Sequence, residues 1–475
     1  MTVPFWVAGK PVTNDTNAVV RHPFDGGEAG SHHVPSTSDI ETAVQAAADV
    51  ADEFATLPAH VRAGALDHVS RVLGERSEEI AQLITAESGK PLKWARGEVG
   101  RAVSTFRWAA EEARRFSGEL QRLDTDPGGT GRIALVRRVA RGPVLGITPF
   151  NFPLNLVAHK VAPAIAVGAP IVLKPAPATP LTALLLGEIL AETGLPAGSW
   201  SILPIGNEET AELVKDPRLP VVSFTGSVPV GWSIRESVPR KHVALELGGN
   251  GAVLVCPDWT DLDFAAQRIA TFGMYQAGQS CISVQRVYVH TDVYDSLREK
   301  VLAQVAALRT GDPREDGVDV GPLINEAAAV RVESWVSDAV AVGGTLLTGG
   351  GRSGAAVEPT VLADVPEDAS MMAEEVFGPV VSLIRVSSVD EGVARINASR
   401  FGLQAGVFTR DLPTAFDVSA RLKVGGVLVG DVPSFRADQM PYGGVKDSGV
   451  GREGPAAAMA DLTEERVTVL TGITL

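Results

Sequence analysis

The sequence predicts an α/β fold in which short buried strands alternate with helices. From Pro143 onward, short apolar runs are separated by stretches with helical spacing, and the pattern starts again near Ala252. One segment, residues 221–231, passes from an apolar strand through a glycine turn into a helix start. Alternation of this kind predicts mostly parallel sheets that are covered by helices, a frame that commonly binds a dinucleotide.

Residues 1–125 are predicted to be mostly helical, because apolar residues recur at helical spacing over 43–54, 63–83 and 99–115. A glycine-rich turn then leads into the β-branched run 133–139, in which arginines are interspersed. This run is typical of a strand on an exposed hairpin.

The first α/β unit holds five candidate strands. Thr179 and Pro180 predict the start of the helix between the second and third of them, and Gly194 with Pro196 predicts its end. Asn207 opens the next helix. The strands are expected at 144–147, 171–173, 200–203, 221–224 and 243–247.

A second α/β unit follows, with no fixed repeat and no low-complexity linker before it. The tail adds one short strand at 466–470. The other predicted elements are strand 252–255, helix 262–274, strand 287–290, helix 294–308 and strands 345–347, 380–386 and 405–408.

Composition narrows the classes of function. A formal charge of −15 without a basic run argues against nucleic acid as a partner. The longest apolar run, 161–173, is interrupted by two prolines and is too short to span a membrane, and the first residues do not resemble a signal peptide. With only two cysteines, no disulfide framework is expected, and a chain of 475 residues needs no metal to hold its core. We therefore expect a cytoplasmic protein without a metal site.

The glycine turn within 221–231 is a candidate pyrophosphate site. A helix N-terminus offers unpaired N–H groups and a partial positive charge. Ser227 is the predicted N-cap, Pro229 lies in the first turn, and Gly226 lets the backbone approach a ligand closely. Because the GxGxxG spacing is absent, a purely structural turn glycine remains the alternative.

Three side chains are suited to acyl chemistry. Cys281 lies among small residues that leave room for a substrate, whereas Cys256 at a strand end is typical of a core cysteine. Glu246 ends an apolar strand before two glycines, where burial would raise its pKa toward that of a general base. Asn151 stands between aromatic residues just past the strand 144–147, where its amide could hold an oxyanion. Taken singly, a core cysteine, a solvent-facing glutamate and a turn asparagine are the structural alternatives.

Together these segments resemble the aldehyde dehydrogenase superfamily over nearly the whole chain, from the loop around Gly9 to the final strand. The resemblance rests on six motifs in family order: PFNFP at Asn151, FTGS at Gly226, LELGG at Glu246, GQSC at Cys281, EEVFGP at Glu375 and PYGGVKDSGVGREG from Pro441.

The resemblance implies an aldehyde dehydrogenase-like α/β fold with three parts. A Rossmann-type dinucleotide-binding domain would cover 1–125 and 142–247, and an α/β catalytic domain would cover 248–450. A small β oligomerisation element would be formed by 126–141 and 451–475. Relatives of this kind assemble as homodimers or homotetramers through such an element.

The resemblance also implies oxidation of a small-molecule aldehyde to a carboxylic acid. Cys281 as thiolate would add to the carbonyl, and the Asn151 amide with the Cys281 N–H would hold the oxyanion of the thiohemiacetal. Hydride transfer to the nicotinamide would leave a thioester on Cys281, and Glu246 would activate the water that hydrolyses it.

Similarity assigns the cofactor site as well. Lys174 would reach the adenosine ribose, Glu375 would bind the nicotinamide ribose, and Phe377 would lie beside the nicotinamide ring. Many NAD-preferring members carry a glutamate three residues after the lysine, where this chain has Pro177. Without that carboxylate a 2′-phosphate is not repelled, so NADP is favoured over NAD. The remaining expected cofactor contacts are Thr148, Pro149, Phe150, Gly226, Ser227, Gly231 and Leu247.

The substrate is suggested by the segment 430–442, which is similar to a branch with lactaldehyde, glycolaldehyde and phosphonoacetaldehyde dehydrogenases. Arg436 in this segment could face an anionic substrate, and a solvated surface arginine is the alternative. Phosphonate-handling relatives have an arginine where this chain has Ser280, which argues against a doubly charged substrate. A small hydroxylated or short-chain aldehyde is therefore expected.

Three alternative functions are less consistent with these residues. CoA-acylating relatives generally lack the glutamate of the LELGG motif, so Glu246 counts against them. A non-catalytic structural or binding member would need none of Cys281, Glu246 and Asn151. A cysteine hydrolase without nicotinamide needs a histidine partner, and none of the eight histidines has a placement near these motifs that suggests one.

Overall fold

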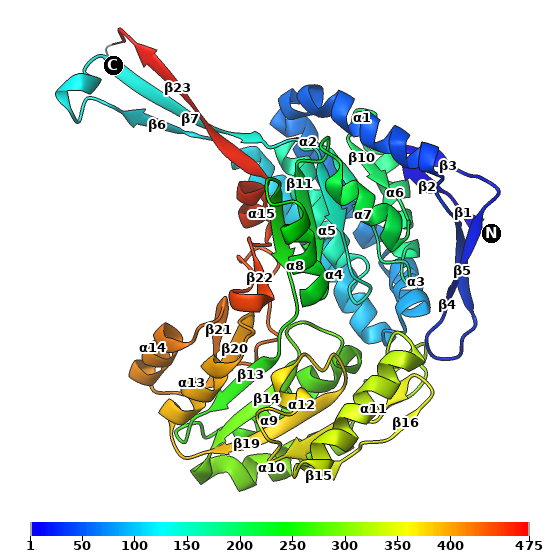
Figure 1. The fold of residues 1–475 in the computed structure, drawn as a ribbon, viewed down its shortest axis with the longest axis vertical. Helices are drawn as coiled ribbons and strands as arrows, with labels where there is room; N and C mark the ends of the chain where they lie inside the picture. Colours follow the sequence, from blue (N-terminus) through cyan, green and yellow to red (C-terminus); the bar gives the residue numbers. More distant parts are fainter. Residues whose placement is uncertain (1, 474–475) are drawn as a thin grey trace.

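The computed structural model describes residues 2–473. Two helix-covered sheets lie end to end, and a narrow arm of strands projects from the upper one (Figure 1). Each sheet has its own hydrophobic core. The predicted α/β class, with a Rossmann-type part and a second α/β part, is confirmed.

The first sheet has eight strands in the order β22-β12-β11-β8-β9-β10-β2-β3. Its five central strands are parallel, and all five were predicted to within one residue at each end. The central strands are β12 (His242–Glu246), β11 (Val221–Thr225), β8 (Val144–Ile147), β9 (Ile171–Lys174) and β10 (Trp200–Ile202). The antiparallel edges are β22 (Gly449–Val450), β2 (Phe5–Val7) and β3 (Lys10–Val12).

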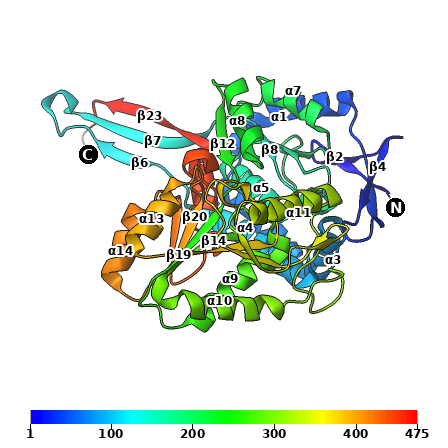
Figure 2. The same cartoon turned by 60° about the horizontal axis from the view of Figure 1, so that its bottom comes forward.

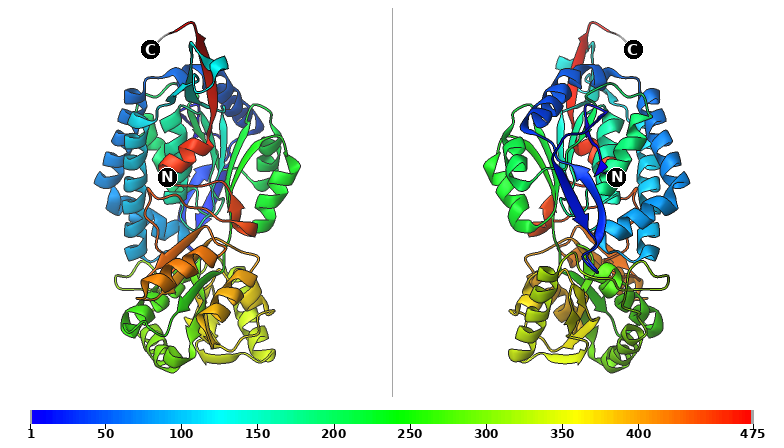
Figure 3. Two further views of the ribbon diagram at one scale, coloured as in Figure 1. Left: turned by 90° about the vertical axis from the view of Figure 1, so that its left-hand side faces the viewer. Right: turned by 90° about the vertical axis from the view of Figure 1, so that its right-hand side faces the viewer.

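Helices cover both faces of this sheet, as the two side views show (Figure 3). Helix α4 packs against α2 and α5 on one face, while α7 and α8 lie together on the other. The helices are α1 (Thr37–Thr56), α2 (Ala59–Glu75), α3 (Ser77–Ser88), α4 (Leu92–Arg115), α5 (Asn155–Val167), α6 (Leu181–Ala191), α7 (Asn207–Lys215), α8 (Val228–Ser237) and α15 (Pro455–Asp461).

The N-terminal part is mostly helical, as predicted, with two differences. Before α1 the chain forms short strands rather than helix. These strands are too short for an alternation of apolar and polar residues to be recognised in the sequence. The stretch 63–83, predicted as one helix, is divided at Arg76, where the backbone leaves helical geometry. The additional strands are β1 (Thr2–Val3), β4 (Asn17–Arg21) and β5 (Glu28–His33).

The start of α6 also differs from the prediction. The helix begins at Leu181, and neither Thr179 nor Pro180 caps it with a side chain. Instead, the N–H groups of Leu181 and Thr182 donate to the buried carboxylate of Glu87, at 2.7 and 3.1 Å. Because this cap comes from α3, no local sequence pattern could indicate it.

The second sheet has the order β15-β18-β19-β14-β13-β20-β21 and is parallel except at β15. Figure 2 shows helices α9 and α10 against it. Its strands are β13 (Gly251–Val255), β14 (Val284–His290), β15 (Thr345–Thr348), β18 (Thr360–Ala363), β19 (Val380–Val386), β20 (Gln404–Phe408) and β21 (Gly426–Val429). Its helices are α9 (Leu262–Met274), α10 (Thr291–Ala306), α11 (Glu326–Ala341), α12 (Ser370–Ala373), α13 (Val389–Ala398) and α14 (Leu412–Arg421).

The arm is an antiparallel sheet that extends away from the two cores (Figures 1 and 2). It consists of β6 (Glu119–Arg122), β7 (Arg132–Ala140) and β23 (Thr463–Thr471), in the order β23-β7-β6. The two strands predicted for this region, 133–139 and 466–470, are confirmed and are longer than expected. Residues far apart in the sequence thus form one hairpin-like projection.

A buried charge pair fixes the start of α5. The carboxylate of Glu98 accepts the N–H groups of Leu154 and Asn155 at 2.9 and 3.0 Å, and it forms an ion pair with Lys90. Both partners of the pair are almost completely buried, with 1% and 0% of the side chains exposed. The pair therefore holds the chain that immediately follows Asn151.

We predict that Glu98→Ala lowers thermal stability substantially. The change leaves Lys90 buried without a counter-charge, which typically costs about 3–5 kcal/mol. The midpoint of thermal unfolding should fall by roughly 3–5 °C in a scanning calorimeter, because a chain of 475 residues has an unfolding entropy of about 1 kcal/mol/K. Glu111→Ala, an exposed position on the same helix, is the control and should change the midpoint by less than about 2 °C. Equal midpoints for the two variants would contradict the prediction.

Candidate active site

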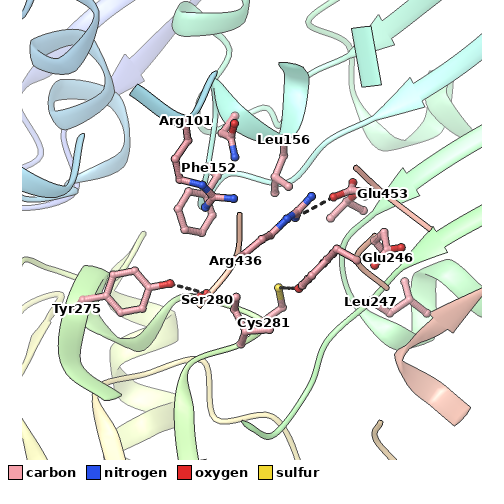
Figure 4. A pocket seen from close by; sticks show the side chains of 14 residues that line it. Arg101, Phe152, Leu156, Glu246, Leu247, Tyr275, Ser280, Cys281, Arg436 and Glu453 are labelled. Atoms are coloured by element: carbon pink, nitrogen blue, oxygen red, sulfur yellow. Dashed lines mark hydrogen bonds and ion pairs between the residues drawn. The ribbon is translucent and has the colours of Figure 1, made fainter. Parts of the chain in front are cut away.

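A cavity lies between the two sheets, where the strands β11 and β12 end and the Cys281 loop begins (Figure 4). Side chains from β11, β12, α4, α5, the loop before β14 and the segment after β21 line it. The lining residues are Arg101, Phe152, Asn155, Leu156, Thr225, Glu246, Leu247, Tyr275, Ser280, Cys281, Ile282, Arg436, Tyr442 and Glu453. The structure thus brings together Cys281, Glu246 and Arg436, which the sequence analysis selected separately.

The loop before Cys281 has an unusual backbone. Gln276 and Ala277 both have φ of +52°, and Gly278 has φ of +70°. A Cβ at Gly278 would lie 1.9 Å from the carbonyl oxygen of Gly378, so only glycine allows this close approach. The loop is therefore held against the segment that carries Phe377, and Cys281 is fixed at the cavity.

Cys281 is half-buried at the cavity wall. Its Sγ lies 2.9 Å from the phenolic oxygen of Tyr442. Burial raises the pKa of the Cys281 thiol to about 12, while the hydrogen bond with Tyr442 acts in the opposite direction. In the absence of any bound molecule, the thiol is thus predominantly protonated at neutral pH.

Asn151 lies in the buried loop after β8 and contacts the Cys281 loop directly. Its Nδ2 donates to the carbonyl of Gln279 at 2.9 Å, and its own carbonyl accepts from the Gln276 side chain. The amide nitrogen carries a second N–H, which stays available for a ligand. Asn151 is therefore hydrogen-bonded to the Cys281 loop, although it does not itself line the cavity.

Glu246 is the last residue of β12 and is 6% exposed. Neither carboxylate oxygen has a hydrogen-bond partner among the described residues. Burial, followed by the nearby charge of Glu453, raises the pKa of Glu246 well above its usual range. The solvent-facing alternative for this glutamate is therefore wrong, and its position is suited to accepting a proton.

Arg436 is buried rather than solvated. Its Nη1 forms an ion pair with Glu453 at 3.1 Å, and its Nη2 contacts His159 at 3.1 Å. Its Nε has no partner among the described residues. Burial alone would raise the pKa of Glu453, but the charges of Arg436 and Lys160 outweigh it and lower that pKa. Because the Arg436 side chain is only 4% exposed, the alternative of a solvated surface arginine is wrong.

A second guanidinium, which sequence analysis missed, faces the same cavity. Arg101 projects from α4, and its Nε donates to Asp438 at 3.1 Å. Figure 4 shows Arg101 and Arg436 on the same side of the cavity, opposite Cys281. Tyr442 and Glu453 were also missed as site residues, although both lie in the motif that begins at Pro441.

The expected pyrophosphate turn connects β11 to α8. The Gly226 N–H donates to the Glu246 carbonyl at 3.1 Å, and Ser227 is the N-cap residue without a side-chain cap bond. A Cβ at Gly231 would lie 2.4 Å from the Leu247 side chain, so glycine lets α8 pack closely on the strand end. The helix N-terminus keeps its N–H groups for an anion.

The predicted ribose contacts lie at neighbouring strand ends. Lys174 ends β9 and is largely buried, and desolvation lowers its pKa to about 8. The Thr148 N–H donates to the Lys174 carbonyl at 3.1 Å, while the Thr148 hydroxyl has no partner among the described residues. Pro177 is exposed three residues after Lys174, so this position carries no carboxylate that would repel a 2′-phosphate.

Glu375 and Phe377 lie across from the Cys281 loop. Glu375 accepts the Gly249 N–H at 3.1 Å, and burial raises its pKa to about 7. The Phe377 ring meets the Phe150 ring edge to face, with centroids 5.9 Å apart. Pro149 connects Thr148 to Phe150 in the same loop. Three features fit a dinucleotide that extends toward Cys281. They are the Thr148 hydroxyl without a partner among the described residues, the N-terminus of α8 and the Phe150–Phe377 pair.

Two absences concern residues 2–473. None of the helices in this part of the chain combines the length and apolar composition that a membrane span requires. No group of three or more potential metal ligands gathers there either.

Comparison with known proteins agrees with this geometry. The family model described as "Aldehyde dehydrogenase family" matches residues 6–468. A 3-sulfolactaldehyde dehydrogenase of Priestia aryabhattai is 40% identical over 466 residues, which cover 98% of this chain and 97% of that protein.

Two solved structures are similar throughout. Aldehyde dehydrogenase 21 of Physcomitrella patens, in complex with the reaction product succinate, has a TM-score of 0.98 and 46% identity and covers 99% of this chain and 98% of its own. The NADP-dependent glyceraldehyde-3-phosphate dehydrogenase of Bacillus halodurans C-125, complexed with NADP, has a TM-score of 0.95 and 35% identity and covers 100% of both chains.

We predict a steep pH dependence for alkylation of Cys281 by iodoacetamide without cofactor. Because burial raises the thiol pKa to about 12, the thiolate fraction should rise about tenfold per pH unit from pH 7 to 10. Mass spectrometry of the two cysteine peptides measures the rate at Cys281 and separates it from Cys256. A rate that levels off near pH 9 would show an unperturbed thiol.

Proposed function

Because this chain belongs to the aldehyde dehydrogenase family, we propose that Cys281 is the nucleophile with which it oxidises an aldehyde to a carboxylic acid. Oxidation of aldehydes with NAD or NADP is the activity of the family and of the named relatives. One observation carries the assignment to these residues: Cys281, Glu246 and two arginines line a single cavity.

The first step is addition of sulfur to the carbonyl. The Cys281 thiolate forms the C–S bond, and the carbonyl π electrons move to oxygen as an oxyanion. We assign stabilisation of this oxyanion to the second N–H of the Asn151 amide and to the Cys281 backbone N–H. A donor of this kind typically contributes about 10²–10³-fold in rate.

The bound nicotinamide supplies the oxidation, by accepting the hydride from the thiohemiacetal carbon. Cys281 then carries a thioester. Glu246 removes a proton from water, the water oxygen attacks the thioester carbon, and the C–S bond breaks to release the acid and the thiolate. A buried carboxylate with a raised pKa is a stronger base than an exposed one, which suits this step.

Glu246 also bears on the CoA-acylating alternative. If CoA resolved the thioester, no side chain would need to deprotonate water beside Cys281. Glu246 lies in the same cavity as Cys281 and has no competing hydrogen bond among the described residues. Hydrolysis is therefore favoured over transfer to CoA.

For the cofactor, we favour NADP. Lys174 is the cation at the expected adenosine ribose position, and Pro177 places no carboxylate beside it. A 2′-phosphate near Lys174 would meet attraction without repulsion. The similar enzyme of Bacillus halodurans is itself NADP-dependent.

For the substrate, we favour a short aldehyde with one anionic group at its far end. Arg101 and Arg436 face the cavity opposite Cys281, and the Arg436 Nε lacks a partner among the described residues. Guanidinium groups bind carboxylates and sulfonates through charge-assisted hydrogen bonds. The similar proteins act on 3-sulfolactaldehyde or hold succinate.

We also propose a homodimer or homotetramer that forms through the arm. Val467 and Val469 on β23 are 57% and 49% exposed, and Leu120 on β6 is 54% exposed. Apolar side chains on a projecting strand are typical of a surface that another copy covers. The residues 126–141 and 451–475 remain our predicted oligomerisation element.

We predict that succinic semialdehyde is oxidised faster than propanal, benzaldehyde, glycolaldehyde or lactaldehyde, with NADP preferred over NAD. Reduced-nicotinamide absorbance measures each pair. Cys281→Ala should lower turnover by at least about 10³-fold, because the nucleophile is lost, and Cys256→Ala is the matched control that should retain it. Full activity of Cys281→Ala would contradict the assigned nucleophile.

We predict that Arg101→Met weakens binding of anionic aldehydes selectively. Loss of one charge-assisted hydrogen bond should raise KM for succinic semialdehyde about tenfold or more and leave KM for propanal nearly unchanged. Arg107→Met, an exposed position on the same helix, is the control. Equal changes in KM for both aldehydes would argue against an anion site at Arg101.

A further inference from the structure

Tyr442 makes the closest polar contact of the nucleophile. Its phenolic oxygen lies 2.9 Å from Cys281 Sγ, and the tyrosine is only 4% exposed. The two side chains, with Ile282 and Leu403, form a small cluster apart from the two main cores. The function assigned above uses Cys281, Glu246 and Asn151 but gives Tyr442 no task.

The phenol is held in place from two directions. The Tyr442 and Glu453 backbones exchange hydrogen bonds at 3.0 and 2.7 Å. The Arg436 guanidinium lies 4.0 Å from the centre of the Tyr442 ring, and Glu453 forms an ion pair with that same arginine. Glu453 thus fixes both the backbone of Tyr442 and the cation over its ring.

We propose that Tyr442 is a further catalytic residue, whose phenolic O–H donates a hydrogen bond to Cys281 Sγ when the sulfur is a thiolate. The proposal rests on the assignment of Cys281 as nucleophile. Tyr442 keeps its proton throughout, so it moves neither a proton nor an electron pair. It stabilises negative charge on sulfur before the C–S bond forms and again when that bond breaks.

The direction of this hydrogen bond follows from the two groups. A thiolate has no proton, so only the phenol can donate. Burial raises the pKa of Tyr442 well above its usual range, so the phenol stays protonated wherever the enzyme works. The Arg436 cation over the ring polarises the O–H group toward the sulfur. A buried thiolate without any donor would be strongly disfavoured.

Other groups near the sulfur cannot replace the phenol. Ser280 accepts a hydrogen bond from Tyr275 at 2.8 Å, and its hydroxyl makes no hydrogen bond to Cys281 Sγ, whose partner is Tyr442. His159 contacts Arg436, and burial together with that arginine lowers the pKa of His159 to about 4. The imidazole is therefore neutral at physiological pH and provides no cation for a thiolate pair.

A weaker hydrogen-bond donor to the Cys281 thiolate raises the thiol pKa. This increase has two opposing effects on the rate at which Cys281 is alkylated. Each unit of increase in the thiol pKa lowers the thiolate fraction about tenfold but raises its intrinsic nucleophilicity about threefold, given a Brønsted slope of about 0.4–0.5. The net loss is about threefold per unit at a pH well below the pKa. If Tyr442 had a purely structural role, its replacement by Phe would change neither the thiol pKa nor the rate of alkylation of Cys281.

The test compares Tyr442→Phe with the wild-type chain. A hydrogen bond to a charged sulfur is strong enough to shift the thiol pKa by about one unit or more. Without cofactor, we expect alkylation of Cys281 by iodoacetamide to become about threefold slower at pH 7.5. The same slowing is expected at each pH from 7 to 10, where the thiolate is a small fraction of the thiol. Tyr288→Phe removes a buried phenol that contacts Arg286 and Glu367 instead, and it should leave the alkylation rate unchanged.

A second measurement does not depend on the folding of that variant. The chain has four tyrosines, and only Tyr442 contacts Cys281 among the described residues. Replacement of all tyrosine by 3-fluorotyrosine makes each phenol a stronger donor, so the thiol pKa should fall and alkylation at pH 7.5 should become faster. An unchanged alkylation rate in either experiment would overturn the role of Tyr442. If Cys281→Ala abolishes turnover while the alkylation rate in Tyr442→Phe is unchanged, only this proposal fails; if Cys281→Ala stays active, the proposed nucleophile fails as well.

Discussion

The buried ion pair between Arg436 and Glu453 is the interaction on which the active site depends. The two side chains are only 4% and 7% exposed, so their desolvation is costly and their separation would be more costly still. Arg436 follows the second sheet in the sequence, whereas Glu453 follows β22, the edge strand of the first. Their contact therefore closes one end of the cavity between the sheets. It also fixes Tyr442, and through Tyr442 the position of the Cys281 sulfur.

The same pair separates the behaviour of two neighbouring carboxyl groups. Glu453 is kept ionised by Arg436 and Lys160, which lower its pKa despite complete burial. Glu246 forms an ion pair with neither cation, and burial together with the charge of Glu453 outweighs their attraction and raises its pKa. Two glutamates that look alike in the sequence thus acquire opposite tendencies, one as a permanent counter-charge and the other as a group that takes up a proton.

The sequence could predict the features that depend on local pattern. The central strands, the glycine turn before α8 and the motifs around Asn151, Glu246 and Cys281 were all visible, and the structure brings those three residues together. It could not predict the cap of α6 by Glu87, the split at Arg76 or the contact of Arg101 with Asp438, which lies 337 residues away. In the sequence, Arg101 is one of several arginines along a helix. Only packing shows that it faces the cavity while Arg107 on the same helix faces solvent.

Charge balance in and around the cavity supports our proposal of a substrate with one anionic group rather than two. Two cations, Arg101 and Arg436, line the cavity and a third, Lys160, lies beside Glu453. Two carboxylates, Asp438 and Glu453, pair with these cations. His159 is neutral because burial lowers its pKa to about 4, and burial raises the pKa of Glu246, so this carboxyl is counted as uncharged while the aldehyde binds and must lose its proton before it activates water. With Lys160 protonated, three positive charges against two negative ones leave a surplus of one. In a low-dielectric site, one carboxylate or sulfonate would neutralise this surplus, whereas a doubly charged group would leave a buried negative charge without a partner. Ser280, which brings no charge to the wall beside Cys281, keeps that balance unchanged.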